Sequence, residues 1–125
     1  MVKVMIVDDS LFMRNHLSNL LAKNGYQPIM AENGEQAVQT YRRDQPDAVL
    51  MDITMPRKDG LQALTEIRAY DSCARVIVLT ALDQELAVTR AIRLGAEDFL
   101  IKPVSPNRLL MVLQKALGWD SMGKG

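Results

Sequence analysis

The stretch Val4-Met5-Ile6-Val7-Asp8-Asp9-Ser10 (VMIVDDS, residues 4–10) holds the pattern that decides the fold. Apolar residues without a polar interruption are typical of a short strand buried on both faces. An acidic pair follows at once, and the serine can cap a helix whose apolar residues recur at a helical period. The stretch therefore predicts a β-strand, a polar turn and the start of an α-helix.

The same order of strand and helix repeats along the rest of the chain. The apolar runs that we interpret as strands are residues 4–7, 29–31, 48–51, 76–79 and 99–101. Helical patterns follow each run, and their expected first caps are Ser10, Asn33, Asp59, the region after Asp83, and Ser105. This alternation predicts an α/β fold, a doubly wound parallel sheet with helices on both faces.

Length and composition bound the class of protein. The 125 residues are enough for one compact domain, which we expect over residues 1–118, with a flexible tail at 119–125. Fifteen basic residues balance fifteen acidic ones, which disfavours direct binding to nucleic acid. The single cysteine cannot form an intramolecular disulfide, and no apolar run reaches the ~18 residues of a membrane span. We therefore expect a cytoplasmic protein without membrane insertion.

Polar residues stand directly after four of the predicted strands. They are Asp8 and Asp9, Asp52, Thr80 and Lys102. In an open parallel sheet, ligands bind outside the carboxyl ends of the strands, where the strand order reverses. Taken singly, each residue has a simpler role as a helix cap, a turn former or a solvated charge, but their joint placement predicts one shallow pocket.

Such a pocket would hold three carboxylates against one ammonium group. Like charges ~4 Å apart repel by about 4 kcal/mol at an effective dielectric constant of ~20. Either one carboxylate stays protonated or a cation enters. Ligands that are all oxygen favour Mg²⁺, with Mn²⁺ as a substitute.

The motifs that carry these residues are MIVDDS (5–10), LMDITMPRKDG (50–60), VIVLTA (76–81) and FLIKP (99–103). With this spacing, the sequence from residue 3 to residue 118 resembles the response-regulator receiver family. The resemblance leans towards the single-domain, chemotaxis-type regulators. It implies a flavodoxin-like sheet of five parallel strands in the order 2-1-3-4-5.

The resemblance also implies the chemistry of the pocket. Asp52 would accept a phosphoryl group from a sensor histidine kinase or a phosphotransfer protein. Lys102 would pair with the phosphoryl oxygens, and Thr80 would donate a hydrogen bond to one of them. The bond between Lys102 and Pro103 would be cis.

A metal site accompanies the phosphoacceptor in this family. By resemblance, Mg²⁺ would be bound directly by Asp9, Asp52 and the backbone carbonyl of Thr54, with Asp8 acting mostly through water. The protein would be a signalling domain that catalyses only its own phosphorylation and dephosphorylation, and not an enzyme with a separate substrate.

The expected switch joins this pocket to a binding surface. Thr80 would move towards the phosphoryl group, and the ring of Phe99 would turn in behind it. A downstream protein target would then bind the face made by residues 84–94, 98–101 and 106–117, and the chain would act as a monomer.

Other classes of protein stay open at this point. The chain could be a receiver module of a longer regulator that dimerises to control an output domain. An aspartyl-phosphate phosphatase would need a second aspartate two residues after Asp52, where Thr54 stands. A flavin-binding protein would need a Gly/Ser/Thr-rich loop after Val7, and the acidic pair stands there instead.

Overall fold

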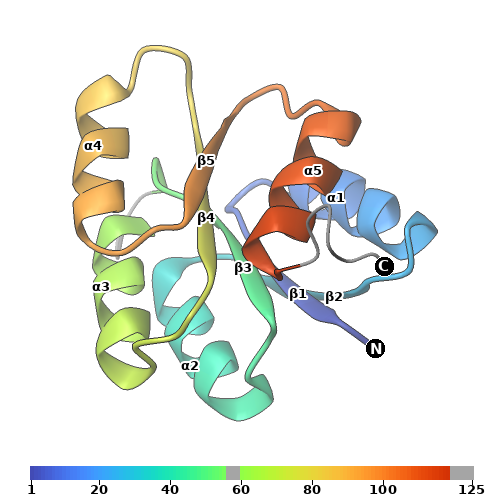
Figure 1. Ribbon diagram of the computed structural model, residues 1–125, viewed down its shortest axis with the longest axis horizontal. Helices are drawn as coiled ribbons and strands as arrows, with labels where there is room; N and C mark the ends of the chain where they lie inside the picture. Colours follow the sequence, from blue (N-terminus) through green and yellow to red (C-terminus); the bar gives the residue numbers. More distant parts are fainter. Residues whose placement is uncertain (56–59, 119–125) are drawn as a thin grey trace.

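The computed structural model describes residues 1–55 and 60–118, in which β-strands alternate with α-helices (Figure 1). In chain order the elements are β1 Lys3–Val7, α1 Leu11–Lys23, β2 Gln27–Ala31, α2 Gly34–Asp44, β3 Ala48–Asp52, α3 Gly60–Tyr70, β4 Val76–Thr80, α4 Glu85–Arg93, β5 Asp98–Ile101 and α5 Pro106–Ala116.

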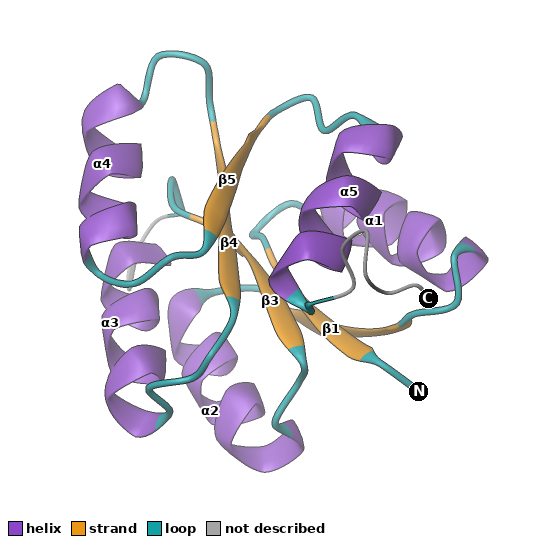
Figure 2. Ribbon diagram, viewed as in Figure 1, coloured by secondary structure: helices purple, strands orange, loops and turns teal. Residues whose placement is uncertain are grey.

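The strands form one parallel sheet in the order β2-β1-β3-β4-β5. Helices α1 and α5 cover one face, and α2, α3 and α4 cover the other (Figure 2). The predicted fold class and strand order are confirmed. Because the chain changes direction across the sheet between β1 and β3, their carboxyl ends border the crevice where such folds bind ligands.

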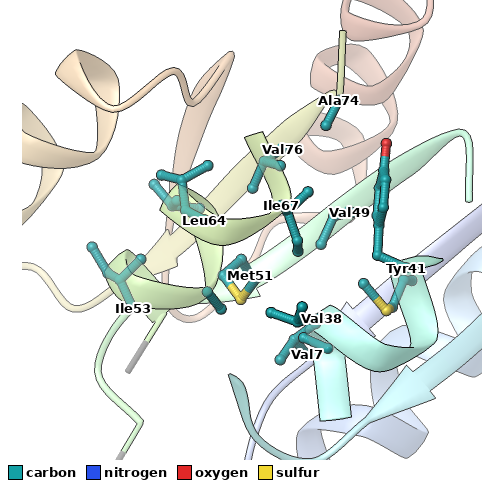
Figure 3. Close-up of a cluster of buried hydrophobic side chains, with 14 of the residues drawn as sticks. Val7, Val38, Tyr41, Val49, Met51, Ile53, Leu64, Ile67, Ala74 and Val76 are labelled. Carbon is teal, nitrogen blue, oxygen red and sulfur yellow. The ribbon is translucent and has the colours of Figure 1, made fainter. Parts of the chain in front are cut away.

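Each face of the sheet has its own apolar core, which explains the uninterrupted apolar runs. Along β1, Val4 and Ile6 pack into the cluster beneath α1 and α5, while Met5 and Val7 pack into the cluster beneath α2 and α3. Figure 3 shows part of the second cluster, with Tyr41 among the strand side chains. Full burial of one such aliphatic side chain contributes about 2 kcal/mol to folding.

Side-chain caps begin three of the helices as predicted. Ser10, Asn33 and Ser105 each accept a hydrogen bond from the backbone N–H three residues on, at 3.2, 2.8 and 3.4 Å. These bonds satisfy N–H groups that the first helical turn leaves without partners. The predicted cap at Asp59 and the predicted tail at 119–125 lie outside the described residues.

β1, β2 and β5 begin one or two residues before their predicted runs, and β3 and β4 continue one residue past the end of theirs. Asp52 pairs with Leu79 across β3 and β4, and Thr80 pairs with Ile101 across β4 and β5. Backbone pairing continues there although the side chain is polar, because the ladder uses main-chain groups only. Both site residues are therefore the last residues of strands and not the first residues of loops.

Candidate functional site

The predicted polar residues lie at the carboxyl edge of the sheet. Asp52 and Thr80 end β3 and β4, while Asp8 and Lys102 directly follow β1 and β5. Asp8, Asp52 and Thr80 are 0%, 2% and 1% exposed. Asp9, the next residue after Asp8, is exposed to solvent.

Lys102 joins the two buried carboxylates. Its Nζ donates to Asp8 Oδ2 at 2.9 Å and to Asp52 Oδ2 at 3.1 Å. Buried charges are costly unless they are paired and hydrogen-bonded, so this ammonium group stabilises the acidic pocket.

The remaining oxygens of these carboxylates also accept hydrogen bonds. Asp8 Oδ1 accepts from the N–H of Ser10 at 2.9 Å. Asp52 Oδ1 accepts from the N–H of Thr54 at 2.9 Å and from the Thr54 hydroxyl at 2.7 Å. Over residues 1–55 and 60–118, no buried side-chain nitrogen or oxygen lacks a partner. The side chain of Asp52 is thus held in one orientation before any ligand binds.

Burial and charge act in opposite directions on the ionisable groups. Burial raises the pKa of Asp8 above its usual value, although hydrogen bonds from Ser10 and Lys102 oppose the shift. Burial alone would lower the pKa of Lys102, but the hydrogen bond to Asp8 and the charge of Asp52 outweigh it and raise that pKa. Lys102 is therefore firmly cationic at neutral pH.

The carboxylates of Asp8, Asp9 and Asp52 form a group suited to a divalent cation. One oxygen from each lies within 4.8 Å of the others. Mg²⁺ prefers hard oxygen ligands and is commonly held by one or two carboxylates together with water. With one ammonium group against three carboxylates, the pocket can accommodate a further positive charge, and the donor set fits Mg²⁺.

A sequence family accounts for this arrangement. Residues 4–114 match the response regulator receiver domain. The chain belongs to the response regulator receiver family. Receivers of this family are signalling domains and not enzymes with a separate substrate, as predicted.

The most similar relatives include chemotaxis proteins. The receiver is 46% identical to the chemotaxis protein CheY of Bacillus subtilis over 116 residues, which is 92% of this chain and 97% of the relative. It is 44% identical to CheY of Thermotoga maritima over 114 residues, covering 90% of this chain and 95% of that one. A solved structure titled as the CheX-CheY-BeF3-Mg+2 complex from Borrelia burgdorferi is similar with a TM-score of 0.86 and 36% identity. It covers 91% of this receiver and 87% of that chain.

Thr80 and Phe99 line one cavity between β5 and α4. The cavity has a volume of about 390 Å³ and is lined by Thr80, Ala81, Leu82, Gln84, Glu85, Val88, Thr89, Phe99 and Ile101. Phe99 is half-buried, and the Thr80 hydroxyl donates to the carbonyl of Ala81 at 3.3 Å. The structure therefore places both residues of the predicted switch beside one open space, while their movement stays a prediction.

Three contacts of the receiver site were not predicted from the sequence. The Thr54 hydroxyl bonds to Asp52, and Arg14 donates to the backbone carbonyl of Asp8 at 2.8 Å. A Cβ atom at Gly60 would overlap the backbone of Asp52 and Ile53, so only glycine fits where α3 begins.

The Lys102–Pro103 bond is cis, as the resemblance implies.

Proposed function

We propose that the receiver accepts a phosphoryl group from a histidine kinase or phosphotransfer protein on Asp52, and that this controls a chemotaxis target. The observation that carries the proposal is the buried Asp52 carboxylate, fixed by Lys102 and Thr54 beside the acidic pair. A carboxylate is a weak nucleophile, so the transfer depends on in-line positioning and on neutralising charge.

The group transfer balances without a further reactant. A bond forms between an oxygen of Asp52 and phosphorus, and the bond from phosphorus to the donor imidazole nitrogen breaks. The electron pair of the broken bond stays on that imidazole nitrogen, and the other ring nitrogen carries a proton, so that a neutral imidazole leaves. The Lys102 ammonium group now donates to two carboxylates, and its hydrogen bond to Asp52 would pass to a phosphoryl oxygen. The Thr80 hydroxyl would release the carbonyl of Ala81 and donate to a second phosphoryl oxygen.

The proposed cofactor is Mg²⁺, for which Mn²⁺ can substitute. Asp9, Asp52 and the Thr54 carbonyl would hold it directly, with Asp8 acting through water. When bound, Mg²⁺ neutralises negative charge on the carboxylates and on the transferred group. The Mg+2 named with the Borrelia burgdorferi CheY complex supports this choice.

The proposed target surface is the face formed by α4, β5 and α5. It carries exposed apolar side chains, of which Leu86, Ile101 and Met111 are 82%, 40% and 56% exposed. Exposed apolar groups beside the Thr80–Phe99 cavity could meet a protein partner whose affinity changes when Phe99 moves. The CheX named in the same relative's complex supports a protein target.

We further propose that the receiver acts in the cytoplasm as a monomer and does not bind nucleic acid directly. None of the described helices is both long and apolar enough to cross a membrane. The alternative, a receiver module that dimerises to control an output domain, is not better supported than this proposal.

Phosphotransfer from purified kinases tests the function. Each sensor histidine kinase of the source genome is first autophosphorylated and then mixed with the receiver and Mg²⁺. At least one kinase should lose its label to the receiver within seconds to minutes, and omission of Mg²⁺ should slow the transfer strongly. Transfer from none of them, with an active reference pair in the same assay, would contradict the proposal.

A further inference from the structure

Arg14, in the first turn of α1, reaches back to the acidic loop. Its backbone N–H donates to the carbonyl of Ser10 at 3.0 Å, which places it inside the helix. Its guanidinium Nη1 donates to the carbonyl of Asp8 at 2.8 Å, and the side chain is only 12% exposed. The nearly buried guanidinium of Arg14 therefore contacts the backbone at the edge of the site.

The carbonyl that Arg14 holds belongs to the peptide group between Asp8 and Asp9. The Asp8 side chain is oriented by its own partners, Ser10 and Lys102. In the described part of the chain, no hydrogen bond restrains the carboxylate of Asp9, which is exposed. The peptide plane that Arg14 holds contains the Cα of Asp9, so this contact fixes the point from which the Asp9 side chain extends.

A second contact of Arg14 is weaker. Its Nη2 lies 3.8 Å from Oε2 of Glu32, whose side chain is 58% exposed. An ion pair at this distance with one solvent-exposed partner contributes little. The bond to the Asp8 carbonyl is therefore the contact that matters for the site.

We propose that Arg14 is a positioning residue for the metal site, which holds the Asp8–Asp9 peptide so that the Asp9 carboxylate faces the cation. This inference rests on the proposed function, because it assumes that Mg²⁺ is the ligand. Groups that orient metal ligands typically change metal affinity by about 10- to 100-fold when they are removed. Here the oriented ligand is one of several, so the lower end of that range applies.

The test uses calorimetric titration of Mg²⁺ together with thermal unfolding of the metal-free receiver. Arg14→Met keeps the apolar stem and removes the donor, and it should weaken Mg²⁺ binding about tenfold. Arg14→Lys retains one donor and should have an affinity between those of Arg14→Met and the wild type. Glu32→Gln should bind Mg²⁺ as the wild type does, because only the weak ion pair is lost.

Arg68→Met is the matched control for stability. Arg68 is also half-buried, and its Nη1 donates to a backbone carbonyl, that of Ala74, at 3.0 Å. Ala74 lies before β4, at the opposite edge of the sheet from the site. Arg68→Met should lower the unfolding temperature as Arg14→Met does, but it should leave Mg²⁺ affinity unchanged.

The outcomes separate this inference from the proposed function. Wild-type affinity in Arg14→Met would overturn the role of Arg14 and leave the metal site standing. Equal loss in Arg14→Met and Arg68→Met would assign the effect to stability and also overturn it. A wild type that binds no Mg²⁺ at millimolar concentration would overturn both. If Arg14→Met does not fold, Arg14→Lys decides, and wild-type affinity there would overturn the inference.

Discussion

At the scale of single residues, the site depends on how each oxygen of Asp52 is occupied. Lys102 holds one oxygen, and the backbone and hydroxyl of Thr54 hold the other. These bonds fix the carboxylate that we propose as the nucleophile, and some of them would be exchanged if it bound a metal or a phosphoryl group. The site is therefore preorganised, and its hydrogen bonds are rearranged rather than newly built.

The two aspartates after β1 should differ in their contribution to metal binding. Asp9→Ala should weaken Mg²⁺ binding at least about tenfold, because a direct ligand and a full negative charge are lost. Asp8→Ala should weaken it less, because Asp8 is mainly the partner of Lys102. Calorimetric titration at neutral pH measures both, and an unchanged affinity in Asp9→Ala would place the metal elsewhere.

At this scale, the sequence predicted which residues line the site but not all of their contacts. Asp8, Asp52, Thr80 and Lys102 were predictable because the carboxyl ends of parallel strands share one edge. The Thr54 hydroxyl bond depends on a side-chain rotamer in a turn, which no periodicity encodes. The hydrogen bond from Arg14 to the Asp8 carbonyl also depends on a side-chain rotamer, and no sequence period predicts it.

At the scale of elements, α2 is joined to the end of α3 by a partly buried hydrogen bond. The Tyr41 hydroxyl, on α2, donates to Asp71 Oδ2 at 2.7 Å, directly after α3 ends. The bond from Tyr41 and the backbone bond from Cys73 hold the pKa of Asp71 below its usual value. Burial of Tyr41 and its bond to Asp71 raise the pKa of that phenol.

This pair makes stability depend on pH. A carboxyl whose pKa is lowered by folding adds stability above its unfolded pKa of ~3.9, and this stability is lost as the pH falls through the folded value. Tyr41→Phe should therefore lower the free energy of unfolding by about 1 kcal/mol at pH 7. The difference from the wild type should shrink below about pH 4.

Chemical denaturation at pH 7 and at pH 3 measures this difference. Tyr70→Phe is the control, because Tyr70 packs edge-on against Tyr41 and its ring is kept in the variant. That variant should show no such dependence on pH. A loss in Tyr41→Phe that is equally large at pH 3 would contradict the role given to Asp71.

The elements themselves were largely predictable from the sequence. Apolar runs marked the strands because both faces of this sheet are covered, and polar caps marked the starts of α1, α2 and α5. Helix α4 was less clear at its start, since Gln84 caps it without a side-chain hydrogen bond. The sequence predicted the ends of β3 and β4 one residue too early, because backbone pairing continues through Asp52 and Thr80 after the apolar residues end.

At the scale of the whole molecule, the doubly wound sheet separates packing from chemistry. Apolar clusters on its two faces stabilise the fold, while charged groups are gathered at the carboxyl edge. The cavity beside Thr80 and Phe99 lies between this edge and the α4–β5–α5 face. Under the proposed function, phosphorylation at the edge would alter the surface on the flank through Phe99, which lines this cavity and packs against the cluster beneath α2 and α3.

Phosphorylation of Asp52 is tested most directly by intact-protein mass spectrometry after incubation with acetyl phosphate and Mg²⁺. The wild type should gain one phosphoryl group, and Asp52→Asn should gain none. Circular dichroism of the variant, which should match the wild type, shows that the fold is kept. Full phosphorylation of Asp52→Asn in the presence of Mg²⁺ would contradict the assignment of Asp52 as the phosphoacceptor.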